Sequence, residues 1–170
     1  MNTQKTADPK TLPHNTGING ALLQPLQIIP TPGGPVLHML RQGSALLPDF
    51  GAGFGEIYFS EVLPRHVKAW KCHCRQTQHF AVPSGLLRIV LYDDRPNSAT
   101  KGVLCRLLLG RPENYALLRI PTGVWYGFAA VGTAPALICN CADIPHDPHE
   151  GQRLPVDTPS IPYCWEAAEA

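Results

Sequence analysis

The chain has 170 residues, of which 18 are proline and 15 are glycine, and its 14 basic and 13 acidic residues leave a formal net charge of +1. With 44% apolar residues and almost no net charge, this composition excludes intrinsic disorder and argues against a nucleic-acid partner. The many prolines leave little room for long helices, because each one removes a backbone donor and clashes with the preceding turn. We therefore expect a single turn-rich β domain.

The first part of the chain is polar and rich in turn-forming residues. We expect residues 1–20 to form a flexible N-terminal arm and residues 21–170 to form the single domain. No run approaches the ~18 consecutive apolar residues that a membrane span needs, and no apolar core of a secretory signal is visible. The six cysteines are therefore interpreted as free thiols in a reducing cytoplasm. The sequence thus predicts a cytoplasmic protein with no membrane partner.

Short runs of β-forming residues, each bounded by Pro, Gly, Asn or Asp, follow one another through most of the chain. Helical periodicity is absent except at the extreme C-terminus. Many short strands hide their edges by closing a barrel or by stacking two sheets, so we expect an all-β barrel or jelly roll. The nine predicted strands are residues 36–40, 56–62, 67–75, 77–82, 86–92, 103–109, 115–120, 125–131 and 136–141.

Several spaced segments carry a resemblance to one family. The segments are Gly55–Glu61, Val67–His73, Pro83–Gly85, Val90–Arg95, Leu109–Tyr115, Ile120–Phe128 and Asp157–Trp165. In this order they resemble the dTDP-4-dehydrorhamnose 3,5-epimerases, cupin-fold enzymes of nucleotide-sugar biosynthesis, over nearly the whole chain. The Ile-Pro-x-Gly-x-x-x-Gly-Phe run is the most specific segment. The chain looks like a short, divergent branch of that family.

The resemblance implies a cupin-type antiparallel jelly-roll β-barrel, a homodimer that shares strands, and a nucleotide-sugar pocket inside the barrel. It also implies removal of protons from C3 and C5, next to a C4 ketone, and their return to the opposite face without a metal or organic cofactor. Such chemistry needs a base, a donor to the enolate oxygen and an acid on the far face. The alternative is a non-catalytic nucleotide-sugar or carbohydrate-binding cupin that has lost the base.

The resemblance carries the family's Arg-Gly-x-His segment over to residues 68–71 of this chain. Lys68 then takes the place of the arginine that holds phosphate, and Lys71 stands where the base histidine would be. The aspartate that orients that base matches Asp157. The resemblance therefore implies that Lys68 binds substrate and that Lys71 and Asp157 belong to the catalytic group.

Three further positions follow from the same resemblance. The family's pocket lysine aligns with Gln78, and its tyrosine acid falls near Cys139 or Asn140. An aromatic residue that stacks on the nucleotide base lies near His146. We therefore expect Gln78, Asn140 and His146 to contribute to substrate binding.

Lys71 is a poor candidate for the base, because a free lysine titrates near a pH of about 10.4. Residues two apart in a strand share a face, so His73 is expected on the same side as Lys71. Histidine titrates close to neutral pH. We hypothesise that His73 is the base and that Lys71 is its electrostatic partner.

A metal-dependent cupin is a third possibility that the residues disfavour. Metal-binding cupins use a His-x-His pair, a later Glu and a further His, whereas this chain offers Lys71-Cys72-His73, glutamines and Tyr126. We therefore expect no metal and no other cofactor, and Tyr126 is expected to contact the substrate instead. The pairs Cys72/Cys74 and Cys139/Cys141 are interpreted as packing residues.

Overall fold

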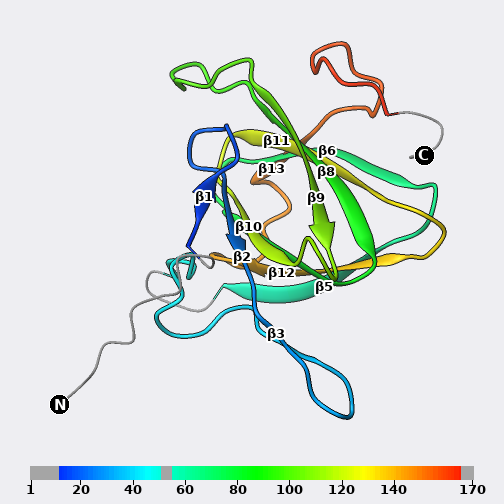
Figure 1. Cartoon of the computed structure of the whole chain (residues 1–170). Helices are drawn as coiled ribbons and strands as arrows, with labels where there is room; N and C mark the ends of the chain where they lie inside the picture. Colours follow the sequence, from blue (N-terminus) through cyan, green and yellow to red (C-terminus); the bar gives the residue numbers. More distant parts are fainter. Residues whose placement is uncertain (1–11, 51–54, 166–170) are drawn as a thin grey trace.

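The computed structural model describes residues 12–50 and 55–165, and these form thirteen β-strands and no helix. Two antiparallel sheets face each other as the walls of a barrel, and a short hairpin projects away from it (Figure 1). Since the described residues include no helix, none of them forms a helix long and apolar enough to cross a membrane. The expected all-β architecture is confirmed for this part of the chain.

The six-stranded sheet has the order β1-β2-β10-β7-β12-β5, and every neighbouring pair in it is antiparallel. Its strands are β1 (His14–Asn15), β2 (Leu22–Pro25), β5 (Glu56–Val62), β7 (Gln78–Ser84), β10 (Ala116–Ile120) and β12 (Ala136–Ala142).

The five-stranded sheet has the order β13-β6-β11-β8-β9 and is also antiparallel throughout. Its strands are β6 (Val67–His73), β8 (Leu86–Asp93), β9 (Leu104–Gly110), β11 (Val124–Ala130) and β13 (Gly151–Arg153). The projecting hairpin consists of β3 (Ile28–Ile29) and β4 (Val36–Leu37).

From His14 onwards, the N-terminal part of the chain pairs with the six-stranded sheet. Residues 1–11 of the expected arm lie outside the described residues. The remainder of that arm is not free, because His14 pairs with Leu23 and Ile18 is fully buried in the core. Burial of one large aliphatic side chain contributes about 1.5–3 kcal/mol, which adds to the strand pairing in holding this short polar segment against the sheet.

The hydrophobic core fills the space between the two sheets. Inward-facing side chains of both sheets form one cluster, which includes Leu87, Ile89 and Leu118. Phe80, Tyr126, Phe128 and Ile138 belong to this cluster and also line the cavity described below. The core therefore forms one boundary of the cavity.

A second cluster covers the outer face of the five-stranded sheet. The Trp70 ring lies 5.6 Å from the Trp165 ring and 6.1 Å from the Tyr163 ring, measured between centroids. Trp70 Nε1 also donates a hydrogen bond of 3.2 Å to the Val156 carbonyl. The C-terminal segment is thus held against the outside of β6, away from the barrel interior.

A buried carboxylate organises the turn after β8. Asp93 accepts hydrogen bonds from Arg95 Nε (2.8 Å), Ser98 Oγ (2.6 Å) and Thr100 Oγ1 (2.7 Å). Arg95 also donates to the Asn19 carbonyl, which ties the turn to the N-terminal segment. The Arg95 guanidinium, with the two hydroxyls, holds the pKa of Asp93 well below its usual range.

Candidate active site between the two sheets

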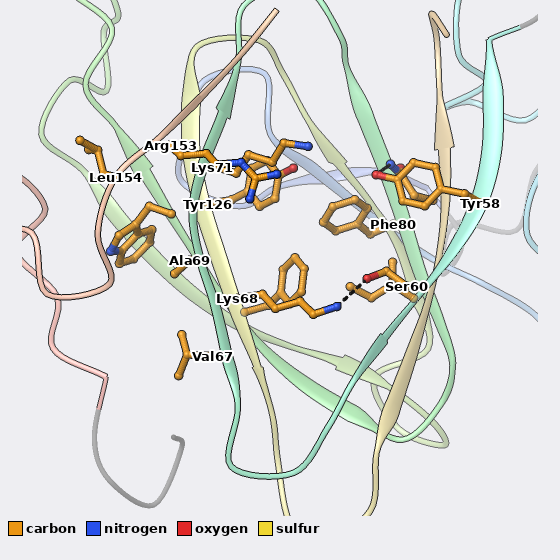
Figure 2. Close-up of a pocket in the computed structure, with 14 residues that line it drawn as sticks. Tyr58, Ser60, Val67, Lys68, Ala69, Lys71, Phe80, Tyr126, Arg153 and Leu154 are labelled. Carbon is orange, nitrogen blue, oxygen red and sulfur yellow. Dashed lines mark hydrogen bonds between the residues drawn. The ribbon is translucent and has the colours of Figure 1, made fainter. Parts of the chain in front are cut away.

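A cavity of about 590 Å³ opens between the two sheets, a volume typical of small-molecule sites (Figure 2). Strands β5, β7 and β12 contribute from one sheet, and β6, β11 and β13 contribute from the other. The lining residues of the space between the sheets are Tyr58, Ser60, Lys68, Lys71, Phe80, Tyr126, Phe128, Ile138, Asn140 and Arg153. Val67, Ala69, Trp70 and Leu154 also border it but belong to the cluster on the outer side of β6.

A bulge in β6 directs two lysines to the same side. Lys68 pairs with Phe128 and Lys71 pairs with Tyr126, so three steps along β6 match two steps along β11. The extra residue of such a bulge changes which side chains face inward. Lys68 and Lys71 consequently both point into the cavity, whereas Ala69 lies on the opposite side of the strand (Figure 2).

The cavity is cationic. Lys68 Nζ donates to Ser60 Oγ (3.1 Å) and to the Glu61 carbonyl (2.6 Å) of the facing sheet. Arg153 pairs with Lys71 in the β13–β6 ladder, and both side chains line the cavity. Burial lowers the pKa of Lys71, and the Arg153 charge lowers it further. No carboxylate side chain is among the lining residues, so the cavity suits an anionic ligand.

Behind one wall, a carboxylate, an imidazole and a phenol form a chain of hydrogen bonds. His73 is only 4% exposed; its Nδ1 bonds to Glu150 Oε1, and its Nε2 lies 3.0 Å from the Tyr126 hydroxyl oxygen. The other oxygen of Glu150 accepts the backbone N–H groups of Arg75 (3.1 Å) and Gln76 (3.2 Å). This chain ends at Tyr126, which lines the cavity.

The protonation states in this chain follow from its contacts. Burial raises the pKa of Glu150, but the bonds from His73 and the two backbone N–H groups outweigh it and leave that pKa below its usual value. The ionised carboxylate only accepts, so the His73 proton resides on Nδ1 and Nε2 accepts the Tyr126 hydroxyl. Burial lowers the pKa of His73 and raises that of Tyr126, so both groups are neutral near pH 7.

On the facing wall, a row of amides supports a second phenol. Asn140 Nδ2 donates to the Tyr58 hydroxyl oxygen (2.9 Å) and to Gln78 Oε1 (2.6 Å). Gln78 Nε2 donates in turn to Gln76 Oε1 (2.7 Å). Both Gln78 and Asn140 are almost completely buried, and Tyr58 carries this network to the cavity.

Half of the eight site residues expected from the sequence line this cavity. Lys68, Lys71, Tyr126 and Asn140 line it together. Gln78 does not line it but contacts Asn140 directly.

Two expected residues lie at a smaller neighbouring cavity of about 120 Å³. His73 and His146 both line it, and Lys71 and Arg153 line both cavities. His73 does not line the larger cavity, because Tyr126 stands between them. His73 therefore reaches the larger cavity through the Tyr126 hydroxyl.

The carboxylate beside His73 is Glu150. The resemblance instead implied that Asp157 lies beside Lys71, at the position of the family's base, and the structure contradicts this. Asp157 is exposed and lines neither cavity. The reason is strand β13, in which Gly151 pairs with His73 and so brings the preceding Glu150 against the imidazole. The chain then leaves the cavity, and the Val156 carbonyl next to Asp157 contacts Trp70 on the outer face.

Three residues of the site escaped the sequence reasoning: Tyr58, Glu150 and Arg153. A signal existed for Tyr58, because residues 56–62 alternate and place Tyr58 and Ser60 on one face of a strand. No such signal existed for Glu150 and Arg153, because the strand that places them, β13, is only three residues long.

Among the described residues, no group of three or more His, Cys, Asp or Glu side chains is arranged to hold a metal ion. All six cysteines are free thiols in this structure.

Comparison with curated proteins finds sugar-biosynthesis relatives. No protein-family profile matches the chain. The chain is 39% identical over 114 residues to the probable low-salt glycan biosynthesis epimerase Agl13 of Haloferax volcanii, which covers 65% of this chain and 72% of the relative. It is 32% identical over 114 residues to the spore coat polysaccharide biosynthesis protein SpsL of Bacillus subtilis, which covers 66% of this chain and 75% of the relative.

Solved structures of nucleotide-sugar isomerases and epimerases match almost the full length of this chain. A dTDP sugar isomerase from Desulfovibrio desulfuricans G20 is 55% identical, with a TM-score of 0.84, and the match covers 91% of this chain and 98% of that chain. The dTDP-4-dehydrorhamnose 3,5-epimerase of Bacillus anthracis str. Ames shares the fold at 15% identity, with a TM-score of 0.75 and coverage of 92% and 89%. The expected cupin-type jelly roll is thereby confirmed. The chain belongs to the dTDP-4-dehydrorhamnose 3,5-epimerase family.

Proposed function

We propose that the protein is an isomerase that epimerises a nucleotide-linked 4-keto-6-deoxy sugar by removing a proton next to the ketone. Family membership and the 55% identity to a dTDP sugar isomerase support this activity. The observation that carries it is the Glu150–His73–Tyr126 chain, which ends in a cationic cavity. The relatives named for glycan and spore coat polysaccharide biosynthesis support a role in polysaccharide synthesis.

Binding of the nucleotide sugar relies on its negative charge. Lys68, Lys71 and Arg153 place three basic side chains at a cavity without a lining carboxylate, which suits the negative charge of a diphosphate. The aromatic rings of Phe80 and Phe128 lie on the same walls and offer apolar surface to a sugar or a base. The cavity therefore supplies both parts that such a ligand requires.

Proton removal proceeds through Tyr126. As the C–H bond next to the ketone breaks, its proton moves to Tyr126 Oη and the Tyr126 hydroxyl proton moves to His73 Nε2. The electron pair of the C–H bond becomes that of the enolate, and the Lys71 ammonium stabilises the negative oxygen. Glu150 stabilises the imidazolium that forms on His73, so the positive charge is balanced inside the protein.

A non-catalytic binding protein is the weaker alternative. Binding of a nucleotide sugar requires the cavity and its cations, but it requires no buried carboxylate, imidazole and phenol in series. Burying Glu150 and His73 costs desolvation free energy, and this burial brings no benefit to a protein that only binds the nucleotide sugar. The hydrogen-bonded chain therefore favours the enzyme.

The assembly proposed is a homodimer in a reducing, cytoplasmic setting. Strand β5 is an edge of the six-stranded sheet, and its outward side chains Ile57 and Phe59 are 53% and 64% exposed. Exposed apolar residues on a sheet edge are typical of a surface that pairs with a second copy. The six free thiols support the reducing compartment. Light scattering of the wild type and of Phe59→Asp tests the dimer, and a monomeric wild type contradicts it.

Solvent exchange tests the activity. The protein is incubated in D₂O with dTDP-4-keto-6-deoxyglucose and related 4-keto sugars, and deuterium at C3 and C5 is followed by proton NMR and mass spectrometry. We expect incorporation and an epimerised product for the wild type, and a loss of both for His73→Asn. His66→Asn is the matched control, because His66 is exposed and bonds only within its own turn. Saturable binding without exchange contradicts the proposed activity.

A further inference from the structure

Inversion at a carbon requires a proton donor on the face opposite the base, and the cavity offers one. We propose that Tyr58 is the acid that returns a proton to the far face of the sugar ring. This inference rests on the proposed function and adds a second residue to it. Its basis is the position of Tyr58, its single amide partner and the lack, among the described residues, of a group that accepts its proton.

The two phenols come from opposite sheets. Tyr58 lies on β5 of the six-stranded sheet, and Tyr126 lies on β11 of the five-stranded sheet. Figure 2 shows Tyr58 on one side of the cavity and Tyr126 with Lys71 on the other. A sugar ring bound between the sheets therefore presents one face to Tyr126 and the other face to Tyr58.

The orientation of Asn140 defines which way the Tyr58 hydroxyl donates. Asn140 Oδ1 accepts the backbone N–H of His79 (3.1 Å), so the amide nitrogen must be the end that faces Tyr58. This nitrogen donates to a lone pair of the Tyr58 oxygen and has no lone pair of its own to accept a proton. The Tyr58 hydroxyl proton therefore remains free to point into the cavity.

Asn140 is itself held firmly. Its Nδ2 also donates to Gln78, Gln78 donates to Gln76, and Gln76 Nε2 donates to the Ile144 carbonyl (2.7 Å). Each amide in this row is buried and oriented by the next one, and the row ends on the backbone. Such a satisfied network holds the Tyr58 oxygen in one place.

The hydrogen-bond partners of the two tyrosines assign Tyr126 to proton removal and Tyr58 to proton return. Tyr126 faces the free Nε2 of His73, which can take its proton, whereas Tyr58 faces only an amide donor. Burial raises the pKa of Tyr58, the Asn140 bond opposes this and the nearby Glu56 charge adds to it, so the phenol is protonated at neutral pH. Among the described residues, no group bonded to Tyr58 accepts its proton, so the hydroxyl is available to a ligand in the cavity.

The proposed step balances. The Tyr58 O–H bond breaks and a C–H bond forms on the far face, while the enolate electrons form that bond and the C4 carbonyl is restored. The phenolate left on Tyr58 then takes a proton from solvent. The product differs from the substrate only in configuration, and no oxidant, reductant or cofactor is consumed.

Tyr58→Phe tests this assignment in D₂O with a 4-keto-6-deoxy sugar that the wild type epimerises. Loss of a general acid lowers the rate about 10²–10⁴-fold, so we expect product formation to fall at least about 100-fold. Deuterium should still enter the recovered substrate at the same carbon, because Tyr126 still removes and returns the proton on its own face. Structural damage alone would not separate exchange from inversion. Tyr92→Phe is the matched control, because Tyr92 packs on the outer face and does not line the cavity.

Each outcome has a defined meaning. A Tyr58→Phe protein that epimerises at the wild-type rate, or that loses exchange together with product while still binding dTDP, overturns the assignment. Absence of exchange in the wild type instead overturns the proposed function. If Tyr58→Phe does not fold, 3-fluorotyrosine at position 58 keeps the hydroxyl and lowers its pKa. The alkaline limb of kcat must then move to lower pH, and an unmoved limb also overturns the assignment.

Discussion

The His73 imidazole lies against the Tyr126 phenol, with Nε2 3.0 Å from the hydroxyl oxygen and the two rings stacked at a centroid distance of 5.9 Å. In the proposed mechanism, the histidine therefore acts on the substrate through the Tyr126 hydroxyl. The phenol places the reactive oxygen in the cavity, while the Glu150–His73 pair stays buried behind it.

Tyr126→Phe tests this arrangement directly. Removal of the hydroxyl leaves the ring packing against Phe80 and Phe128 but interrupts the proton path. We expect a fall in kcat of about 10²–10⁴-fold with little change in KM, and loss of deuterium exchange at the substrate carbon. Tyr115→Phe is the control, because its hydroxyl bonds to the His38 carbonyl outside the cavity. Unchanged exchange in Tyr126→Phe would show that another group takes the proton.

Glu150→Gln tests the positioning role of the carboxylate. An amide nitrogen beside Nδ1 stabilises the wrong tautomer of His73, so exchange should slow by about 10²-fold or more. Because Glu150 raises the pKa of His73, its loss should also move the acid limb of kcat/KM to lower pH. Unfolding in urea should show a cost of about 1–3 kcal/mol, since the carboxylate accepts several buried hydrogen bonds.

Asp147→Asn provides the comparison for Glu150→Gln. Asp147 lies in the same loop as Glu150 and forms an ion pair with Arg75, whose side chain is 62% exposed, while that of Asp147 is 36% exposed. An exposed pair contributes about 0–1 kcal/mol, so stability and the pH profile should be nearly unchanged. Equal losses in the two variants would mean that the loop as a whole, and not the contact with His73, controls activity.

The pH dependence of exchange follows from the environment of His73. Burial and the Lys71 charge lower the pKa of His73, so the acid limb of kcat/KM should lie below about 6.5, the ordinary value for histidine. Removing the nearby cation in Lys71→Met should move this limb to higher pH. Rate profiles measured from pH 4 to 9 check both shifts, and a limb that moves down in Lys71→Met contradicts the electrostatic account.

Arg153→Met tests the binding role of the cationic cavity. Loss of one charged hydrogen-bonding group should weaken dTDP binding about 10-fold, measured by calorimetry, with a shallower dependence on salt. Lys101→Met is the control, because Lys101 is an exposed residue far from the lining set. Equal effects of the two substitutions would indicate attraction by net charge alone.

Asp93→Asn addresses stability instead of catalysis. Asp93 is fully buried and paired with Arg95, so breaking the pair should cost about 3–5 kcal/mol in urea unfolding at pH 7. The folded-state pKa of Asp93 is lowered, so its stabilising contribution is present above the unfolded value of about 3.9 and is lost as the pH falls further. The difference between wild type and variant should therefore shrink below about pH 4.

The sequence was informative where the chain alternates and where turns separate the strands. The central strands follow from that pattern, and Lys71, Tyr126 and Asn140 were expected in the site and lie at the cavity. Neither pattern nor resemblance revealed Glu150. Its position depends on β13, a three-residue strand that pairs with β6 only through long-range contacts.

The far wall illustrates the same limit. The resemblance placed the acid near Asn140, and the structure shows that Asn140 pairs directly with Tyr58 on the neighbouring strand. A hydroxyl can thus reach the same wall from a different strand, which a one-dimensional alignment cannot detect. The β6 bulge is a comparable case, because it moves Lys68 to the face that simple alternation would give to Ala69.

The bonds from Lys68 to Ser60 and to the Glu61 carbonyl join the two sheets at the exposed rim of the cavity. The ammonium has three N–H donors, so two are engaged here and one remains for a phosphate group. A phosphate that binds at this rim therefore meets a cation already held in place by the facing sheet, and less side-chain freedom is lost on binding. The contact that joins the two sheets thus also pre-orients the cation for an anionic ligand.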